Sequence, residues 1–194
     1  QTIHLQGITD SRLLSNTVHW TPYSDFPGNT EGYRLYRRNQ QGAATELIAE
    51  VPSQVLIWED DVSNLLASPG DFCYLVEAID SESGPAGGMN YSLSNEMCLT
   101  QVPVLWVPNT ILIGGYNDIF MPVVSFADFD QYFMQIHNRW GDIIFTSNQV
   151  GYGWNGMHMG AIAPEGSYGY SISIRDGAGR VYETTGLVHL LVGE

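Results

Sequence analysis

The hydrophobic positions of this chain recur in short runs that alternate with polar positions, and Gly, Pro, Asn, Asp and Ser separate the runs. Alternation places every second side chain on the same face of a β-strand. No stretch keeps the i, i+3, i+4, i+7 apolar spacing with flanking caps that an amphipathic helix requires. With 21 glycines and 9 prolines as punctuation, the pattern predicts an all-β sandwich or barrel.

The first half of the chain predicts seven short strands. We expect them at residues 3–8, 14–20, 33–37, 46–51, 55–58, 72–79 and 94–100. In the third strand, the alternation places Tyr33, Leu35 and Arg37 on one face. Short strands separated by turns every 8–12 residues are typical of an immunoglobulin-like sandwich.

The second half also reads as β-structure. We expect strands at residues 131–137, 143–145, 168–174, 181–185 and 187–192. Between the halves, Pro103 and Pro108 bracket an apolar segment, which predicts a short extended connector. The sequence therefore predicts two immunoglobulin-like β-sandwich domains in tandem, one over residues 1–101 and one over 102–194.

The net charge of the chain restricts the classes of partner that it can bind. The chain has 21 acidic residues against seven basic ones, all of them Arg, and its net charge is −14. Phosphate backbones would repel such a chain, so nucleic-acid binding is excluded as a function, and anionic lipid surfaces are disfavoured. No apolar run reaches the roughly 18 residues of a membrane span. No basic segment followed by an apolar one opens the chain, so we expect no signal peptide in it.

No complete catalytic or metal-binding set is present in the sequence. It lacks a Gly-x-Ser-x-Gly motif, a phosphate loop and a Cys-x-x-Cys pair. Asp60 and Asp61, like Asp128 and Asp130, are expected to be solvated acids at turns. The Met-His-Met segment at 157–159 offers soft copper ligands but more simply forms a glycine-rich loop. We therefore expect no enzyme, no metal and no cofactor.

Four ordered segments of the first half carry a resemblance. They are VHWTP at 18–22, YRLYR at 33–37, PGDFCYLVEA at 69–78 and SLSN at 92–95. In this order they resemble strands B, C and F and the start of strand G of a fibronectin type III domain. The resemblance implies that Trp20 is a core residue. It also implies that the Tyr74 hydroxyl bonds back to the backbone of the preceding corner.

Cys73 and Cys98 are the two cysteines of the chain, too few for a structural zinc site. The fibronectin-like frame places them on strands F and G, which are neighbours in that family. Directly opposed residues of an antiparallel pair have Cα atoms about 4.5–5.5 Å apart, within disulfide range. We predict a disulfide, which implies an oxidising compartment. Two unrelated buried thiols are the alternative.

A second resemblance covers about residues 104–194. Its motifs are HNRWGDIIF at 137–145, WNG at 154–156, APEGSYGY at 163–170 and GLVHLL at 186–191. They resemble, in order, those of the gliding-motility-associated C-terminal domain. That family implies a type B secretion signal of the type IX secretion system, carried by large Bacteroidota surface proteins, adhesins especially. The opening loop at 107–120 lacks the family's acidic motif, so a calcium site is not expected there.

The resemblance points to a recognition surface made of a hairpin tip and two loops. Its residues are Asn138, Arg139, Trp140, Gly141, Trp154, Asn155, Gly156, Pro164, Glu165 and Gly166. Arg and Trp are typical interface anchors. A structural role is the alternative for each motif: Arg139 stacked on Trp140, Trp154 filling the core, and a tight turn at 164–166.

The sequence thus predicts the C-terminal fragment of a secreted cell-surface protein. Its last domain would direct export and attachment to the outer membrane by binding translocon components and a PorP/SprF-like outer-membrane protein. Its first domain would be a spacer. One alternative is an extracellular adhesion or carbohydrate-binding module, in which Tyr23, Phe26 and Tyr36 stack on sugar. Another is a pair of accessory domains from a secreted hydrolase.

Overall fold

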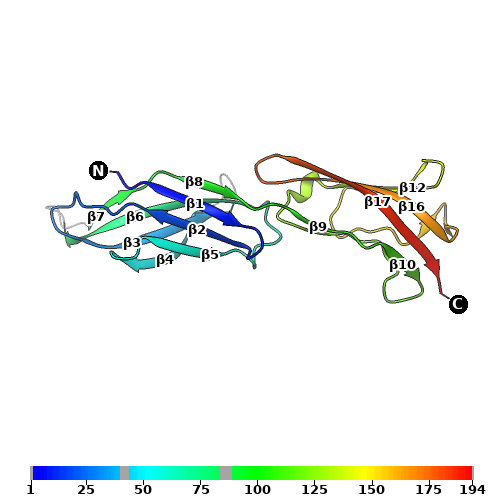
Figure 1. The fold of residues 1–194 in the computed structure, drawn as a ribbon, viewed down its shortest axis with the longest axis horizontal. Coiled ribbons are helices and arrows are strands. Elements are labelled where there is room, and N and C mark those ends of the chain that lie inside the picture. Colours follow the sequence, from blue (N-terminus) through cyan, green and yellow to red (C-terminus); the bar gives the residue numbers. More distant parts are fainter. Residues whose placement is uncertain (1, 40–43, 84–88, 194) are drawn as a thin grey trace. The chain divides into compact units, whose positions relative to one another are not determined.

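The computed structural model describes residues 2–39, 44–83 and 89–193. The chain divides into two compact units, Gln1–Leu66 with Gly70–Gln101 and Ala67–Pro69 with Val102–Glu194. Figure 1 shows that both are built from strands. Within the described ranges, η1 (Phe129–Gln131) is the only helical turn, and no helix has the length and apolarity needed to cross a membrane. The predicted all-β, immunoglobulin-like class is confirmed.

The first unit consists of two antiparallel sheets. One has the order β1 (Leu5–Asp10), β2 (Ser15–Trp20), β5 (Ile57–Asp61). The other has the order β4 (Glu46–Pro52), β3 (Thr30–Arg38), β6 (Asp71–Ser83), β7 (Met89–Leu93), with β8 (Met97–Thr100) also paired to β6. Trp20 is buried, and its ring packs edge-on against Tyr33 with centroids 5.6 Å apart. The predicted core role of Trp20 is therefore confirmed.

The predicted strand over residues 94–100 is wrong in its bounds, because the structure has β7 and β8 on either side of a break. Asn95 lies in that break. Its side chain accepts a hydrogen bond from Leu5 N at 2.8 Å and donates one to Leu5 O at 3.1 Å. The chain thus leaves the β6 ladder so that Asn95 can satisfy the exposed edge of β1.

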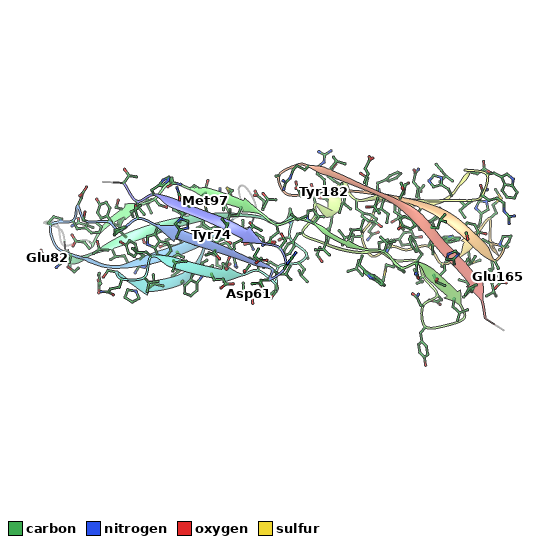
Figure 2. The ribbon with its side chains drawn as sticks, in the orientation of Figure 1. Asp61, Tyr74, Glu82, Met97, Glu165 and Tyr182 are labelled. Atoms are coloured by element: carbon green, nitrogen blue, oxygen red, sulfur yellow. A yellow bond between two sulfur atoms is a disulfide. The ribbon has the colours of Figure 1, made fainter. Side chains whose placement is uncertain are left out.

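The hydroxyl of Tyr74 does not bond to the backbone of the preceding corner, so that expectation is wrong. It donates to Asp60 Oδ2 at 2.7 Å and accepts from Asn16 Nδ2 at 2.8 Å. Figure 2 labels Tyr74 among the strands of this unit. Burial, followed by the negative charge of Asp60, raises the pKa of Tyr74 above its ordinary value.

Asp60 is a core residue rather than a solvated turn acid. It is 6% exposed, and both of its carboxylate oxygens accept from Arg37 Nη1, at 2.8 and 3.0 Å. Arg37 is itself 7% exposed and also donates to Glu46. The alternation correctly placed Arg37 on the same face as Tyr33 and Leu35, and all three are buried. The inner face of β3 therefore carries a charge whose partner comes from the opposite sheet.

The predicted disulfide is present between Cys73 and Cys98. These residues are directly opposed in the β6–β8 register, with Cα atoms 3.9 Å apart. The bond fixes β8 to the centre of the larger sheet. The second unit contains no cysteine, so the cross-link belongs to the first unit alone.

Replacing Cys73 and Cys98 together by Ala is expected to lower the free energy of unfolding of the first unit by about 3 kcal/mol. The bond links residues 25 apart in sequence, and its loss enlarges the conformational entropy of the unfolded chain. Calorimetry of the wild type, with and without reductant, and of the double variant measures the change. The second unit is the internal control. A fall in its transition matching that of the first unit would contradict the prediction.

The second unit has one five-stranded sheet, in the order β10 (Thr110–Ile113), β17 (Val181–Val192), β16 (Gly166–Arg175), β12 (Phe133–His137), β13 (Ile143–Ser147). β10 runs parallel to β17, and the other pairs are antiparallel. A two-stranded sheet pairs β9 (Val104–Trp106) with β11 (Val123–Ser125). The segment expected to be a plain connector therefore contributes a paired strand.

The two strands expected on either side of Gly186 are one continuous strand, β17. Gly186 is paired with Tyr170 of β16, and a Cβ atom at Gly186 would lie 2.4 Å from the Tyr170 hydroxyl oxygen. Gly186 is thus required by the close approach of an aromatic side chain, not by a turn. The residues of β17 on either side of it keep their pairing with β16.

Candidate functional site: the hairpin tip and the adjoining groove

The tip of the β12–β13 hairpin is organised by Asn138. Its Oδ1 accepts hydrogen bonds from the backbone N–H groups of Trp140 and Asp142, both at 2.9 Å. Gly141 has φ +89°, a conformation that side chains disfavour, and its N–H donates to Asn138 O. The sequence prediction of a hairpin with Gly141 in the turn is therefore correct.

Arg139 and Trp140 extend from this tip. The guanidinium carbon of Arg139 lies 5.1 Å from the centroid of the Trp140 ring, within cation–π range. Trp140 nevertheless remains 77% exposed. The contact orders the Arg139 side chain without removing the Trp140 ring from solvent, so both groups are available to a partner.

Trp154, by contrast, is fully buried. It forms an isolated β-bridge with Phe120, and its Nε1 donates to Met157 O at 3.0 Å. Its ring packs edge-on against Tyr168 with centroids 4.9 Å apart. The neighbouring Gly156 has φ +75° and also faces the core. This loop therefore supports the fold, and Asn155 is its exposed member.

Two hydrogen bonds hold the turn at Pro164–Gly166. Tyr168 donates its hydroxyl hydrogen to Pro164 O at 2.6 Å, four residues back in sequence. This is the geometry of a tyrosine corner, found in the second unit instead of the first. Burial raises the pKa of Tyr168, and the positive charge of Arg139 acts in the other direction but is the smaller effect. Glu165 Oε1 accepts from Val192 N at 2.7 Å, and Figure 2 shows Glu165 beside the end of β17.

A groove of about 700 Å³ joins the hairpin tip to this turn. It is lined by Asn138, Arg139, Trp140, Ile144, His158, Met159, Ala161, Ile162, Ala163, Pro164, Glu165, Gly166, Ser167 and Tyr168. The structure thus brings two of the three predicted recognition motifs together, and the Trp154 loop is not part of the lining. Sequence reasoning missed the contribution of the hairpin formed by β14 (Met157–His158) and β15 (Ala161–Ile162). The sequence signal for this hairpin is the run of mostly apolar residues at 157–162, which is interrupted by Gly160.

The groove is apolar with few polar groups. Met159 is 92% exposed and Ile162 is 49% exposed, and both line the groove. His158 Nδ1 lies 3.3 Å from Ile144 O, which can only accept, so Nδ1 is the donor in this contact. Across the described ranges, no group of three His, Cys, Asp or Glu side chains could hold a metal ion. This arrangement is suited to binding an apolar group.

The aromatic residues considered for sugar binding lie in the first unit and do not form one platform. Tyr23 and Phe26 are half-buried and pack edge-to-face, with centroids 4.6 Å apart. Tyr36 lies on β3, where its hydroxyl donates to Glu77 at 2.9 Å. A flat stacking surface shared by the three is therefore not formed.

Residues 105–190 match the family model of the CHU_C Type IX secretion signal domain. The matched segment lies within the second unit and includes the hairpin tip, the Trp154 loop and the groove. The resemblance found in the sequence is therefore confirmed. No curated protein matches the chain.

Among solved structures, a tetra-tandem repeat from the extending region of a large adhesion protein aligns with 97% of this chain and 49% of that one, at 11% identity and a TM-score of 0.50. The FN1–FN3 domains of chicken CNTN1 align with 98% of this chain and 65% of theirs, at 10% identity and a TM-score of 0.41. Pectate lyase Pel3 of Pectobacterium carotovorum aligns with 58% of this chain and 34% of its own, at 18% identity and a TM-score of 0.40. The chain thus spans between a third and two thirds of their length, and the likeness concerns the fold alone.

Proposed function

We propose that residues 102–194 direct export of a cell-surface protein by the type IX secretion system and its attachment at the outer membrane, and that residues 1–101 are a fibronectin type III-like spacer. The secretion signal marks the chain as part of a secreted protein. The observation that carries the proposal is that the matched segment lies in one compact unit with its own core. A recogniser can therefore read a folded surface rather than an extended peptide.

The recognition surface in this proposal is the hairpin tip with the adjoining groove. Arg139 and Trp140 extend from the Asn138 turn, and the Pro164–Gly166 turn also lines the groove. Buried aromatic and Arg anchors dominate the binding energy of protein interfaces. The partners would be translocon components and a PorP/SprF-like outer-membrane protein.

The chain acts by binding and not by catalysis in this proposal, and its parent protein is an adhesin. The disulfide supports folding in an oxidising compartment, as expected for a secreted protein. A repeat of similar fold belongs to a large adhesion protein, and the adhesin part of the proposal rests on that likeness. Sugar binding is the weaker candidate function, because Tyr23 and Phe26 pack edge-to-face and do not form a flat stacking surface.

A reporter fused to residues 102–194 is expected to reach the surface of a cell with the type IX machinery, as efficiently as a fusion to residues 1–194. Arg139→Ala should reduce export while changing the unfolding free energy by less than about 1 kcal/mol, because the side chain lies at an exposed turn. Arg175→Ala, which removes an exposed Arg at the end of β16, is the matched control. Whole-cell labelling of the reporter measures export.

Two outcomes would contradict the proposal in different ways. Retention of the 102–194 fusion in the periplasm, while the 1–194 fusion is exported, would refute the division between signal and spacer. Normal export of the folded Arg139→Ala variant would leave the signal assigned but remove the hairpin tip from its recognised surface.

A further inference from the structure

The residues that line the groove indicate the chemistry of its ligand. We propose that it binds a peptide segment of the export or attachment partner in which an apolar side chain stands next to a carboxylate. This inference rests on the proposed function of the second unit, and it names the kind of segment that the unit would recognise. The apolar side chain would enter the groove, and the carboxylate would pair with Arg139.

The apolar half of the proposal follows from the exposed side chains around the groove. Trp140, Met159 and Ile162 are 77%, 92% and 49% exposed, and they come from the hairpin tip, from the turn between β14 and β15, and from β15. Their apolar surfaces border the same groove, and covering them removes that area from water. Met159 adds an adaptable side chain that can follow the shape of a bound group. Burying a partner's apolar side chain here therefore gains free energy.

The preference for a carboxylate in the bound peptide follows from the positive charge of Arg139. Among the described residues that line the groove, Arg139 carries the only guanidinium. Glu165, the one carboxylate there, accepts a hydrogen bond from Val192 N through its Oε1. The 102–194 half contains eight acidic residues and three Arg, so a strongly acidic partner would be repelled. A single carboxylate placed at Arg139 avoids that repulsion and gains a charge-assisted hydrogen bond.

A peptide fits the remaining polar group better than a lipid does. The tautomer that donates from Nδ1 to Ile144 O leaves Nε2 of His158 as an acceptor, and His158 lines the groove. A peptide backbone supplies an N–H donor for it, whereas an acyl chain supplies none. Ser167 adds a hydroxyl group to the lining. The groove therefore offers an apolar surface, one cation and hydrogen-bonding groups along its length, which together match an extended peptide.

The test uses the 194-residue chain and two acetylated, amidated pentapeptides, Gly-Phe-Leu-Glu-Gly and the same peptide with Gln in place of Glu. Nuclear magnetic resonance titration measures both affinities and maps the shifted amides. The Glu peptide should bind about fivefold more tightly than the Gln peptide, the size of an exposed ion pair. Arg139→Ala should abolish that difference, and Arg175→Ala should preserve it. Ile162→Ser should weaken the binding of both peptides.

Equal affinity for the two peptides would show that the carboxylate is not read and would overturn the proposal. Shifts outside the groove, or no binding of either peptide, would overturn it as well. Binding to phosphatidylcholine vesicles that Trp140→Ala abolishes would assign the surface to a membrane instead. Dimerisation lost in the same variant would assign it to a second copy of the chain. None of these results changes the outcome of the reporter export assay. A failure of the peptide proposal is therefore distinguishable from a failure of the proposed export function.

Discussion

Trp154→Ala is expected to unfold the second unit and abolish export of any fused reporter. Trp154 is fully buried, packs against Tyr168 and bridges Phe120 through paired backbone hydrogen bonds. Replacing a buried Trp by Ala costs about 3–5 kcal/mol, through lost transfer energy and the cavity left behind. Domains of this size have only about 5–15 kcal/mol of stability in total. Calorimetry should show the unfolding transition of the second unit shifted to lower temperature or lost.

Trp140→Ala is the matched control, since it removes the same side chain from an exposed position. Trp140 is 77% exposed, and surface substitutions usually change stability by less than about 0.5 kcal/mol. Its unfolding should therefore resemble that of the wild type. A Trp154→Ala variant that melts with the wild type would show that the core does not depend on this side chain. The first unit should melt normally in both variants.

Asp60→Ala is expected to destabilise the first unit by about 3–5 kcal/mol, because it removes the buried carboxylate that pairs with Arg37 and leaves that guanidinium only its ion pair with the exposed Glu46. Burial acts to lower the pKa of Arg37, but the hydrogen bond and charge of Asp60, together with those of Glu46, outweigh it and raise the pKa. Tyr74 loses its acceptor in the same variant. Urea unfolding of the variant and the wild type measures the loss.

A second substitution shows whether the buried charge of Arg37 causes the loss of stability. Replacing Arg37 by Met in the Asp60→Ala background removes the buried charge that has lost its buried partner and keeps much of the volume, so stability should rise above that of Asp60→Ala alone. A double variant less stable than Asp60→Ala would mean that Arg37 stabilises the unit through packing. Glu59→Ala, on the same strand but outside the Arg37 ion pair, is the matched control.

The strands were largely predictable from the sequence, because alternation reports which face is buried. Tyr33 and Leu35 were placed on one face in this way, and both are buried. The failures occurred where a single side chain interacts across the structure. Asn95 interrupts a strand to reach β1, and Gly186 keeps a strand continuous beneath Tyr170. Neither effect leaves a local pattern in the sequence.

The candidate site was predictable only in part. The hairpin tip follows from the Asn138–Gly141 turn, which is local chemistry. That the tip and the Pro164–Gly166 turn share one groove depends on the pairing of β12 with β16, a long-range contact. The contribution of Met159 depends on the fold for the same reason. The buried pair of Arg37 and Asp60 was invisible because alternation does not reveal charge partners on another sheet.

The pairing of β17 has a consequence for when the signal becomes readable. β17 lies between β10 and β16, and its Val188 and Leu190 are fully buried. Residues 189–192 supply the partner of β10. Ribosomes deliver this strand after every other strand of the unit, so the domain cannot close during earlier synthesis. A prematurely terminated product lacks the strand that completes the sheet. The folded unit therefore forms only on chains translated as far as this strand.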